Sequence, residues 1–294
     1  QGCVANMYAG NPVCCLTNPF LGHEAEPLEK AEEPKKVMVI GGGVAGLSAA
    51  FIAKERGHEV TLYEAGDVLG GNMRLAAYPP GKGDITNMIR SYIHRCQKDG
   101  VKIVMNCEVT PELIKEEKPD SVIIATGSKT LILPIEGIDN PAIIHGSDLL
   151  DGKRAAGKKV LVVGGGMVGC ETAAFLGEQE HDVTVIEFRD TVGADVIHEH
   201  RVYLMKDFED YGIKEITGAK VCKFYEDGVE YETADGVRHE SRGYDSVILS
   251  MGFRNYNPLE EKIKDLVPET HVIGDAIRAR RALDATKEAY EVAS

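Results

Sequence analysis

Two stretches of the sequence repeat one pattern of apolar and polar positions at an offset of 123 residues. In each stretch a short run of mostly β-branched residues, 37–40 and 160–163, comes directly before a glycine-rich turn. Such runs are typical of buried parallel strands. Beyond each turn the apolar residues recur at helical spacing, and a second short apolar run follows. The pattern therefore predicts two β-turn-α-β units.

Weaker patterns predict further elements around these units. They are a helix over 85–97, strands over 101–105 and 121–125, a short strand at 272–273 and a closing helix over 282–292. Between residues 220 and 249, two Asp-Gly dipeptides separate apolar stretches, which is typical of an antiparallel meander. Residues 21–36 hold several charges and two prolines, and we expect them to form a linker.

Each glycine-rich turn has the spacing Gly-x-Gly-x-x-Gly. The glycines are Gly41, Gly43 and Gly46 in the first turn, and Gly164, Gly166 and Gly169 in the second. The first glycine of such a turn permits a tight bend, the second lets the backbone approach a pyrophosphate, and the third lets the helix pack closely on the sheet. The helix N-terminus then offers N–H groups to the phosphates. A single motif of this kind is also compatible with an ordinary tight turn.

An acidic residue, Glu64 or Glu187, ends the second predicted strand of each unit. A carboxylate at this place can accept hydrogen bonds from ribose hydroxyls. Because the acid occurs twice at one offset, we favour two dinucleotide sites over two solvated strand ends. Glu187 would repel a 2′-phosphate, so the second site is expected to prefer NADH to NADPH, although Arg189 nearby would favour a phosphate.

Composition narrows the possible partners. Lys and Arg number 33 against 47 Asp and Glu, which gives a formal charge of −14. We expect neither nucleic acid nor an anionic membrane as a partner, because both need clustered positive charge. No stretch resembles a transmembrane span, and no secretory signal opens the sequence. The seven cysteines lack a disulfide spacing, which favours the cytoplasm.

The paired glycine motifs resemble the two-dinucleotide flavoprotein reductases, in which the first unit binds FAD and an inserted second unit binds NAD(P)H. Ala125-Thr126-Gly127 resembles the motif at the crossing between the domains of that group, where Thr126 and Gly127 would contact FAD. Residues 250–252 are similar to the return crossing, although the first two depart from its pattern. Gly274-Asp275 resembles the late motif whose Asp bonds the flavin's ribityl chain.

This resemblance implies an α/β fold of three layers, with two nested Rossmann-like dinucleotide-binding domains. The FAD-binding domain would comprise residues 34–127 and 253–294, and the NAD(P)H-binding domain would be the insertion 128–252. Residues 1–33 would be the remnant of a cluster-binding segment and a linker.

The N-terminal residues indicate which family of flavoprotein reductases the sequence resembles. Cys3 and Cys15 are separated by eleven residues, and Asn18-Pro19 follows, which is similar to the iron–sulfur segment of the 2,4-dienoyl-CoA reductase, enoate reductase and trimethylamine dehydrogenase family. Residues 69–72 and 76–82 also resemble this family. By this resemblance Gly71, Asn72 and the backbone of Val109 would contact FAD, and Cys3 and Cys15 would bind a 4Fe-4S cluster.

Members of that family also have a barrel domain that carries FMN and the substrate site. A cubane cluster needs four thiolates, and two cysteines do not supply them. Cys3 and Cys15 are therefore expected to be cluster ligands only in an intact protein, of which this chain would be a fragment. The partner of the chain would then be the FMN- and cluster-bearing barrel domain of the same polypeptide. Otherwise the two residues are free cysteines in an N-terminal arm.

The reaction implied by the resemblance is hydride transfer from NADH to FAD, followed by passage of single electrons to the cluster and to FMN of an enoate or dienoyl reductase barrel. It needs no catalytic acid or base from this chain, because the cofactors carry the chemistry. Two alternatives stay open, namely a free-standing NADH-dependent flavoprotein reductase and a structural module that binds only ADP. A disulfide reductase is less favoured, because no Cys-x2-Cys or Cys-x4-Cys pair lies near a flavin motif.

Overall fold

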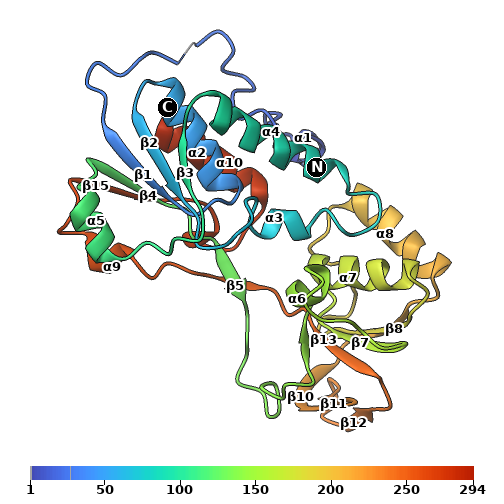
Figure 1. The fold of residues 1–294 in the computed structure, drawn as a ribbon. Coiled ribbons are helices and arrows are strands. Elements are labelled where there is room, and N and C mark those ends of the chain that lie inside the picture. Colours follow the sequence, from blue (N-terminus) through green and yellow to red (C-terminus); the bar gives the residue numbers. More distant parts are fainter. Residues whose placement is uncertain (1, 27) are drawn as a thin grey trace. The chain divides into compact units, whose positions relative to one another are not determined.

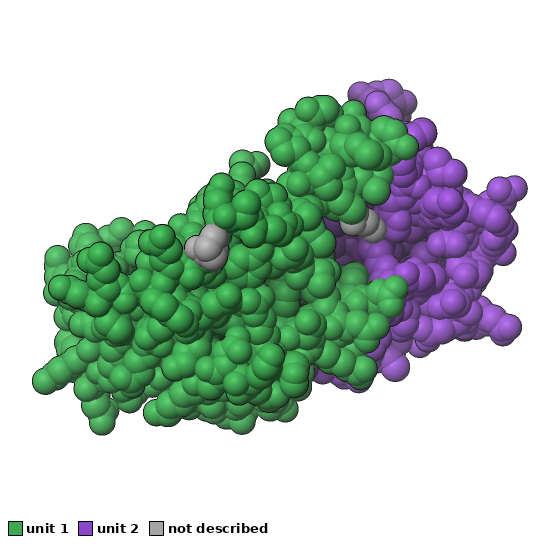
Figure 2. Space-filling view, turned by 90° about the horizontal axis from the view of Figure 1, so that it is seen from above, with its two compact units in different colours: residues 1–77, 84–129, 254–294 green, residues 78–83, 130–253 purple. Residues whose placement is uncertain are grey.

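The computed structural model describes residues 2–26 and 28–294. Two compact units make up the chain (Figure 2). Unit 1 comprises residues 1–77, 84–129 and 254–294, and unit 2 comprises residues 78–83 and 130–253. Most of unit 2 is therefore an insertion into the sequence of unit 1.

Unit 1 is built on a parallel sheet of five strands. Their spatial order is β15 (Glu269–Val272), β4 (Ser121–Ile124), β1 (Lys36–Ile40), β2 (Glu59–Tyr63) and β3 (Lys102–Val104). Successive residues of β1 point to opposite faces, so Val37 and Val39 join one hydrophobic cluster while Met38 and Ile40 join another.

Helices cover both faces of this sheet (Figure 1). The cluster on one face includes residues of α2 (Val44–Glu55), α4 (Asp84–Lys98) and α10 (Ala282–Ala293), and the cluster on the other includes residues of α5 (Pro111–Glu117) and α9 (Glu260–Ile263). Residues 44–53 of α2 are all buried, because α4 and α10 pack against it. Unit 1 therefore has three layers.

Unit 2 is also built on a parallel sheet of five strands, but different elements cover its two faces. Its parallel sheet has the order β6 (Ile144–His145), β13 (Ser246–Leu249), β7 (Lys159–Val163), β8 (Asp182–Ile186) and β9 (Lys214–Ile216). One face packs on α7 (Met167–Glu178) and α8 (His198–Asp210). The other packs on an antiparallel meander formed by β10 (Lys220–Tyr225), β11 (Gly228–Glu232) and β12 (Arg238–Ser241).

The predicted class of fold, α/β with parallel Rossmann-like sheets, is confirmed, but two predicted elements need correction. The meander ends at Ser241, and the apolar run 246–249 is a strand of the parallel sheet instead. This run is buried at every residue, which is typical of a central parallel strand and not of a meander that has one face exposed to solvent. The strand expected at 272–273 is β15, which begins at Glu269 and ends before Ile273.

Several short elements carry little periodic signal and were not predicted. Besides α5, β6, β9 and α9 they are α1 (Gly2–Tyr8), α3 (Asn72–Leu75), β5 (Ser128–Thr130), α6 (Gly146–Leu150), β14 (Phe253–Asn255) and the 3-10 helix η1 (Gly274–Ala276). In the described part of the chain, no helix is both long enough and apolar enough to cross a membrane.

Candidate functional site

The first glycine turn joins β1 to α2 and needs glycine at two of its three motif positions. Gly41 has φ +107°, and a side chain there would begin 2.3 Å from the carbonyl oxygen of Ala125. A side chain at Gly46 would begin 1.9 Å from the carbonyl oxygen of Gly41. At Gly43, in contrast, a side chain would meet no atom within 4 Å. The third glycine therefore lets α2 pack on the turn, and the second leaves its backbone accessible.

Glu64 is fixed beside this turn at the end of β2. Its Oε2 accepts a hydrogen bond from the N–H of Gly42 at 2.7 Å, and its Oε1 accepts one from the N–H of Gly66, also at 2.7 Å. Two backbone donors thus hold the carboxylate in one orientation. Among the hydrogen bonds of the described residues, none joins a side-chain oxygen to the first turn of α2. The N–H groups at this helix end suit an anionic ligand.

The segment before α3 lies against the same turn. The N–H of Gly70 donates to the carbonyl of Gly42 at 2.8 Å. Gly71 has φ +54°, and a side chain there would begin 3.2 Å from the Cα of Gly43. The amide of Asn72 donates to both the carbonyl and the hydroxyl oxygen of Ser128, at 3.3 Å each.

Asp275 belongs to the same group of side chains. The hydroxyl of Ser128 donates to its Oδ2 at 2.8 Å, and the N–H of Arg280 donates to its Oδ1 at 3.0 Å. Glu288 of α10 accepts the N–H of Gly274 at 2.7 Å and forms an ion pair with Arg280. The structure thus brings Asn72, Ser128 and Asp275 together, although Ser128 was not predicted as a site residue.

The remaining residues predicted for unit 1 have other surroundings. The Thr126 hydroxyl donates to the carbonyl of Tyr256 at 2.5 Å, and the carbonyl of Gly127 accepts the N–H of Tyr256 at 2.9 Å. Val109 is buried in the hydrophobic cluster that includes Ile114 of α5. The side chain of Thr126 therefore holds the returning chain in this structure.

The second glycine turn, between β7 and α7, repeats this geometry. Gly164 has φ +105°, and a side chain there would begin 2.4 Å from the carbonyl oxygen of Ser250. A side chain at Gly169 would begin 1.8 Å from the carbonyl oxygen of Gly164. The carboxylate of Glu187 accepts the N–H of Gly165 at 2.6 Å and that of Arg189 at 2.9 Å.

The repeat continues beyond the residues matched in sequence. The N–H of Gly193 donates to the carbonyl of Gly165 at 2.7 Å, as Gly70 does to Gly42 in unit 1. At the same offset, Asp195 corresponds to Asn72. Its Oδ1 accepts the N–H of Met167 at 2.9 Å, at the start of α7 and beside Gly166. Extending the sequence repeat by eight residues, past Glu187, would have identified Asp195.

A buried charge cluster lies on α7 and was also missed. The carboxylate of Glu171 pairs with the ammonium of Lys82, and the side chains are only 8% and 12% exposed. The Nε2 of His200 lies 3.6 Å from the same carboxylate. All three residues belong to unit 2. No sequence spacing links them, because they come from three separate segments.

The cysteines do not form a centre in this structure. Cys3 is exposed on α1, while the Sγ of Cys15 accepts the N–H of Asn18 at 3.4 Å. Over residues 2–26 and 28–294, no three or more His, Cys, Asp or Glu side chains are grouped to hold a metal ion. Cys96 and Cys170 are buried, and burial raises the pKa of each thiol to about 12.

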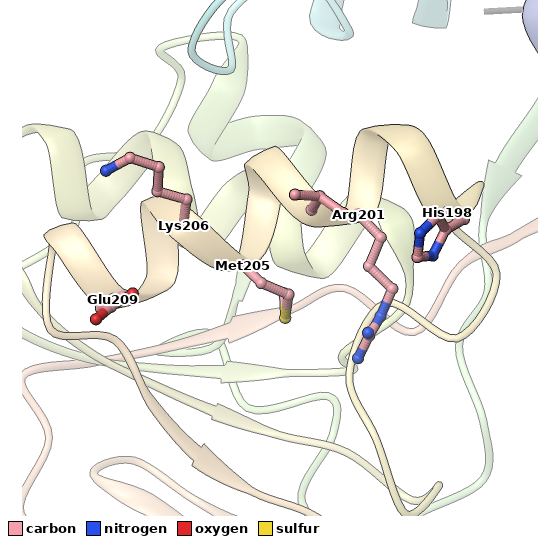
Figure 3. Close-up of a pocket in the computed structure, with 6 residues that line it drawn as sticks. His198, Arg201, Met205, Lys206 and Glu209 are labelled. Atoms are coloured by element: carbon pink, nitrogen blue, oxygen red, sulfur yellow. The ribbon is translucent and has the colours of Figure 1, made fainter.

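A hollow in unit 2 is separate from both glycine turns. Its lining residues all belong to one face of α8 (Figure 3), and they are His198, Arg201, Val202, Met205, Lys206 and Glu209. None of the residues predicted for a site lines it. The two glycine turns, each with an anchored glutamate beside it, place the chain in the class of proteins with two Rossmann-type units.

Comparison with known proteins identifies the family. The chain belongs to the pyridine nucleotide-disulphide oxidoreductase family, whose model matches residues 35–270. It is 34% identical to a cinnamate reductase of Clostridium sporogenes over all of this chain and 44% of the relative. It is also 34% identical to an NADH oxidase of Thermoanaerobacter brockii, over 99% of this chain and 46% of the relative.

A solved structure gives the same result. The complex of 2-naphthoyl-CoA reductase with 2-naphthoyl-CoA matches all of this chain and 45% of its own, with 32% identity and a TM-score of 0.94. The chain thus spans about half the length of each of these three relatives. The family resemblance predicted from the sequence is confirmed. The chain is of the class of NAD(P)H-dependent flavin oxidoreductases.

Proposed function

We propose that this chain accepts hydride from NADH on FAD and delivers the electrons singly to an acceptor in a further domain. The observation that carries the proposal is the duplicated glycine turn with its anchored glutamate, because one such turn suits each dinucleotide. Unit 1 would hold FAD, and unit 2 would hold NADH. When bound, FAD supplies the ability to take two electrons together and release them one at a time.

Residues of unit 1 fit FAD in this proposal. The accessible backbone at Gly43 and the N–H groups that begin α2 would receive the pyrophosphate, and Glu64 would receive the adenosine ribose. Asp275, oriented by Ser128 and Arg280, would bond the ribityl chain. Thr126, Gly127, Gly71, Asn72 and Val109 remain proposed contacts of the flavin.

In unit 2, the position of the Glu187 carboxylate favours NADH over NADPH in this proposal. The carboxylate of Glu187 already accepts two backbone N–H groups, so it is held in place beside the turn. A 2′-phosphate would bring negative charge against it, whereas the free hydroxyl of NADH would donate to it. The similarity to a protein named NADH oxidase is consistent with this preference.

The test is an anaerobic absorbance spectrum of the chain after incubation with FAD, before and after addition of NADH or NADPH. We expect retained flavin absorbance that NADH bleaches faster than NADPH does. Glu187→Ala should reduce the preference for NADH, with Glu215→Ala as a control on the neighbouring strand β9. A protein that stays colourless after incubation with FAD would contradict the proposal and favour a module that binds only ADP.

The acceptor would be an iron–sulfur cluster and FMN in a further domain of a longer polypeptide. Relatives about twice as long, one of them named a cinnamate reductase, support this part of the proposal. Cys3 and Cys15 would then be two of the four cluster ligands. In that longer protein, Cys15→Ser should lower the iron content while Cys222→Ser should not. Equal iron in both variants would remove Cys15 from the proposed set of cluster ligands.

A further inference from the structure

The two glycine turns differ in what lies beside the second glycine. In unit 2 a side chain at Gly166 would begin 3.4 Å from the Oδ2 of Asp195, whereas at the matched Gly43 it would meet no atom within 4 Å. The N–H of Met167, which begins α7, is already bonded to the Oδ1 of Asp195 at 2.9 Å. The second glycine is where the backbone approaches a pyrophosphate. Of the two matched positions, Gly43 and Gly166, only Gly166 has a carboxylate beside it.

The backbone around Asp195 is firmly held. Val192 is fully buried, and the N–H of Gly193 donates to the carbonyl of Gly165. Arg201 extends from α8 (Figure 3), and its guanidinium donates to the carbonyl of Val192 at 3.1 Å and to the hydroxyl of Thr191 at 2.8 Å. The side chain of Asp195 is exposed. The carboxylate therefore projects from a backbone segment that is held in place.

We propose that the Asp195 carboxylate competes with the coenzyme's diphosphate for the start of α7 and so weakens coenzyme binding. This rests on the proposed function, since it takes the second glycine turn as the nicotinamide dinucleotide site. To bind, the diphosphate must displace Asp195 from the N–H of Met167 and lie near its negative charge. Water screens an exposed carboxylate, so the effect is a moderate loss of affinity rather than exclusion.

Asn72, which matches Asp195 in unit 1, suggests why weaker binding of the coenzyme would be useful. Asn72 is neutral and bonds Ser128 instead of the start of α2. A flavin that stays bound gains nothing from a competing carboxylate. A nicotinamide coenzyme must leave after each hydride transfer, and a moderate affinity lets it exchange. Asp195 thus suits a co-substrate, and Asn72 suits a resident cofactor.

The experiment measures dissociation constants by anaerobic calorimetry on the chain saturated with FAD and reduced beforehand with dithionite, so that added NADH binds without further hydride transfer. Asp195→Asn installs the residue of unit 1 and keeps a hydrogen-bond acceptor, and Asp195→Ser does the same with a different neutral cap. Both should bind NADH about three- to tenfold more tightly than wild type. ADP should respond in the same direction, and adenosine, which has no phosphate, should not respond. Asp190→Asn removes an equal charge from the same loop and serves as the control.

Each outcome decides a different point. NADH binding that is no tighter in both Asp195 variants than in wild type would overturn the inference. The inference would also be overturned if Asp190→Asn tightened NADH binding equally, or if the Asp195 variants bound adenosine more tightly. In either case the effect would not be competition with the diphosphate. Wild-type protein that binds no NADH at all would instead refute the proposed function, and the inference with it.

Discussion

Units 1 and 2 carry the same glycine turn on different surroundings. The backbone contacts match, from the glycines to the anchored Glu64 and Glu187. The side chains around the two turns differ, since Ser48 of α2 corresponds to Glu171 of α7, and Asn72 corresponds to Asp195. Both differences add negative charge to unit 2. The comparison indicates that backbone geometry makes the sites alike and that neighbouring charges make them different.

The largest expected effect tests the charged position on α7. Lys82→Met would leave the buried carboxylate of Glu171 without its ammonium partner, and should lower the free energy of unfolding of unit 2 by about 3–5 kcal/mol. Glu171→Ser, which installs the residue of unit 1, should cost less because the flexible Lys82 can reach water. Urea unfolding of both variants measures the difference. A cost for Lys82→Met no larger than that for Glu171→Ser would show that the ion pair is not what distinguishes the two helices.

The second prediction separates packing from binding within one turn. Gly46→Ala places a methyl group against the carbonyl of Gly41, and should lower the stability of unit 1 by about 3 kcal/mol. Gly43→Ala meets no atom within 4 Å, so stability should be kept while the affinity for FAD falls. Thermal unfolding without FAD and a flavin titration report the two quantities. Undiminished FAD binding by Gly43→Ala would remove this turn as the pyrophosphate site.

The smallest effect concerns Cys170, which corresponds to Leu47 of unit 1. Burial raises the pKa of this thiol from 9.0 to about 12, so its protonated form is favoured in the folded state. The stability that it contributes is complete below pH 9 and is lost as the pH rises towards 12. Between pH 8 and pH 10.5, Cys170→Ala should therefore lose about 1–2 kcal/mol less stability than wild type. Unfolding of Cys222→Ala over the same range is the control, and equal losses in all three proteins would contradict the assignment.

The sequence predicts much of this architecture because the strongest signals are local. Apolar runs, glycine spacing and a terminal glutamate lie within about thirty residues, and together they specify each β-turn-α-β unit. Predictions weaken where the signal is short or mixed. Helix α8 buries only Leu204 and Phe208 and has little apolar periodicity, and the buried run of β13 does not distinguish a parallel strand from part of a meander.

The candidate site is predicted only in part for the same reason. The glycines and both glutamates follow from spacing, whereas Ser128 and Glu288 become neighbours of Asp275 and Gly274 only through folding. The pairing of Lys82 with Glu171 joins segments about ninety residues apart, and no periodicity marks it. Asp195 is different, because the internal repeat contains its match.

The nesting of the two units has a consequence for how the chain acquires its structure during synthesis. Strand β15 and helix α10 complete the sheet and core of unit 1, yet they follow the whole of unit 2 in the sequence. All segments of unit 2 emerge from the ribosome before them, so that unit can fold first. The early part of unit 1 must wait with α2 uncovered by α10. The nascent chain thus exposes the part of α2 that α10 later covers, for the time it takes to make well over a hundred further residues, and a chaperone would find a binding site there in that interval.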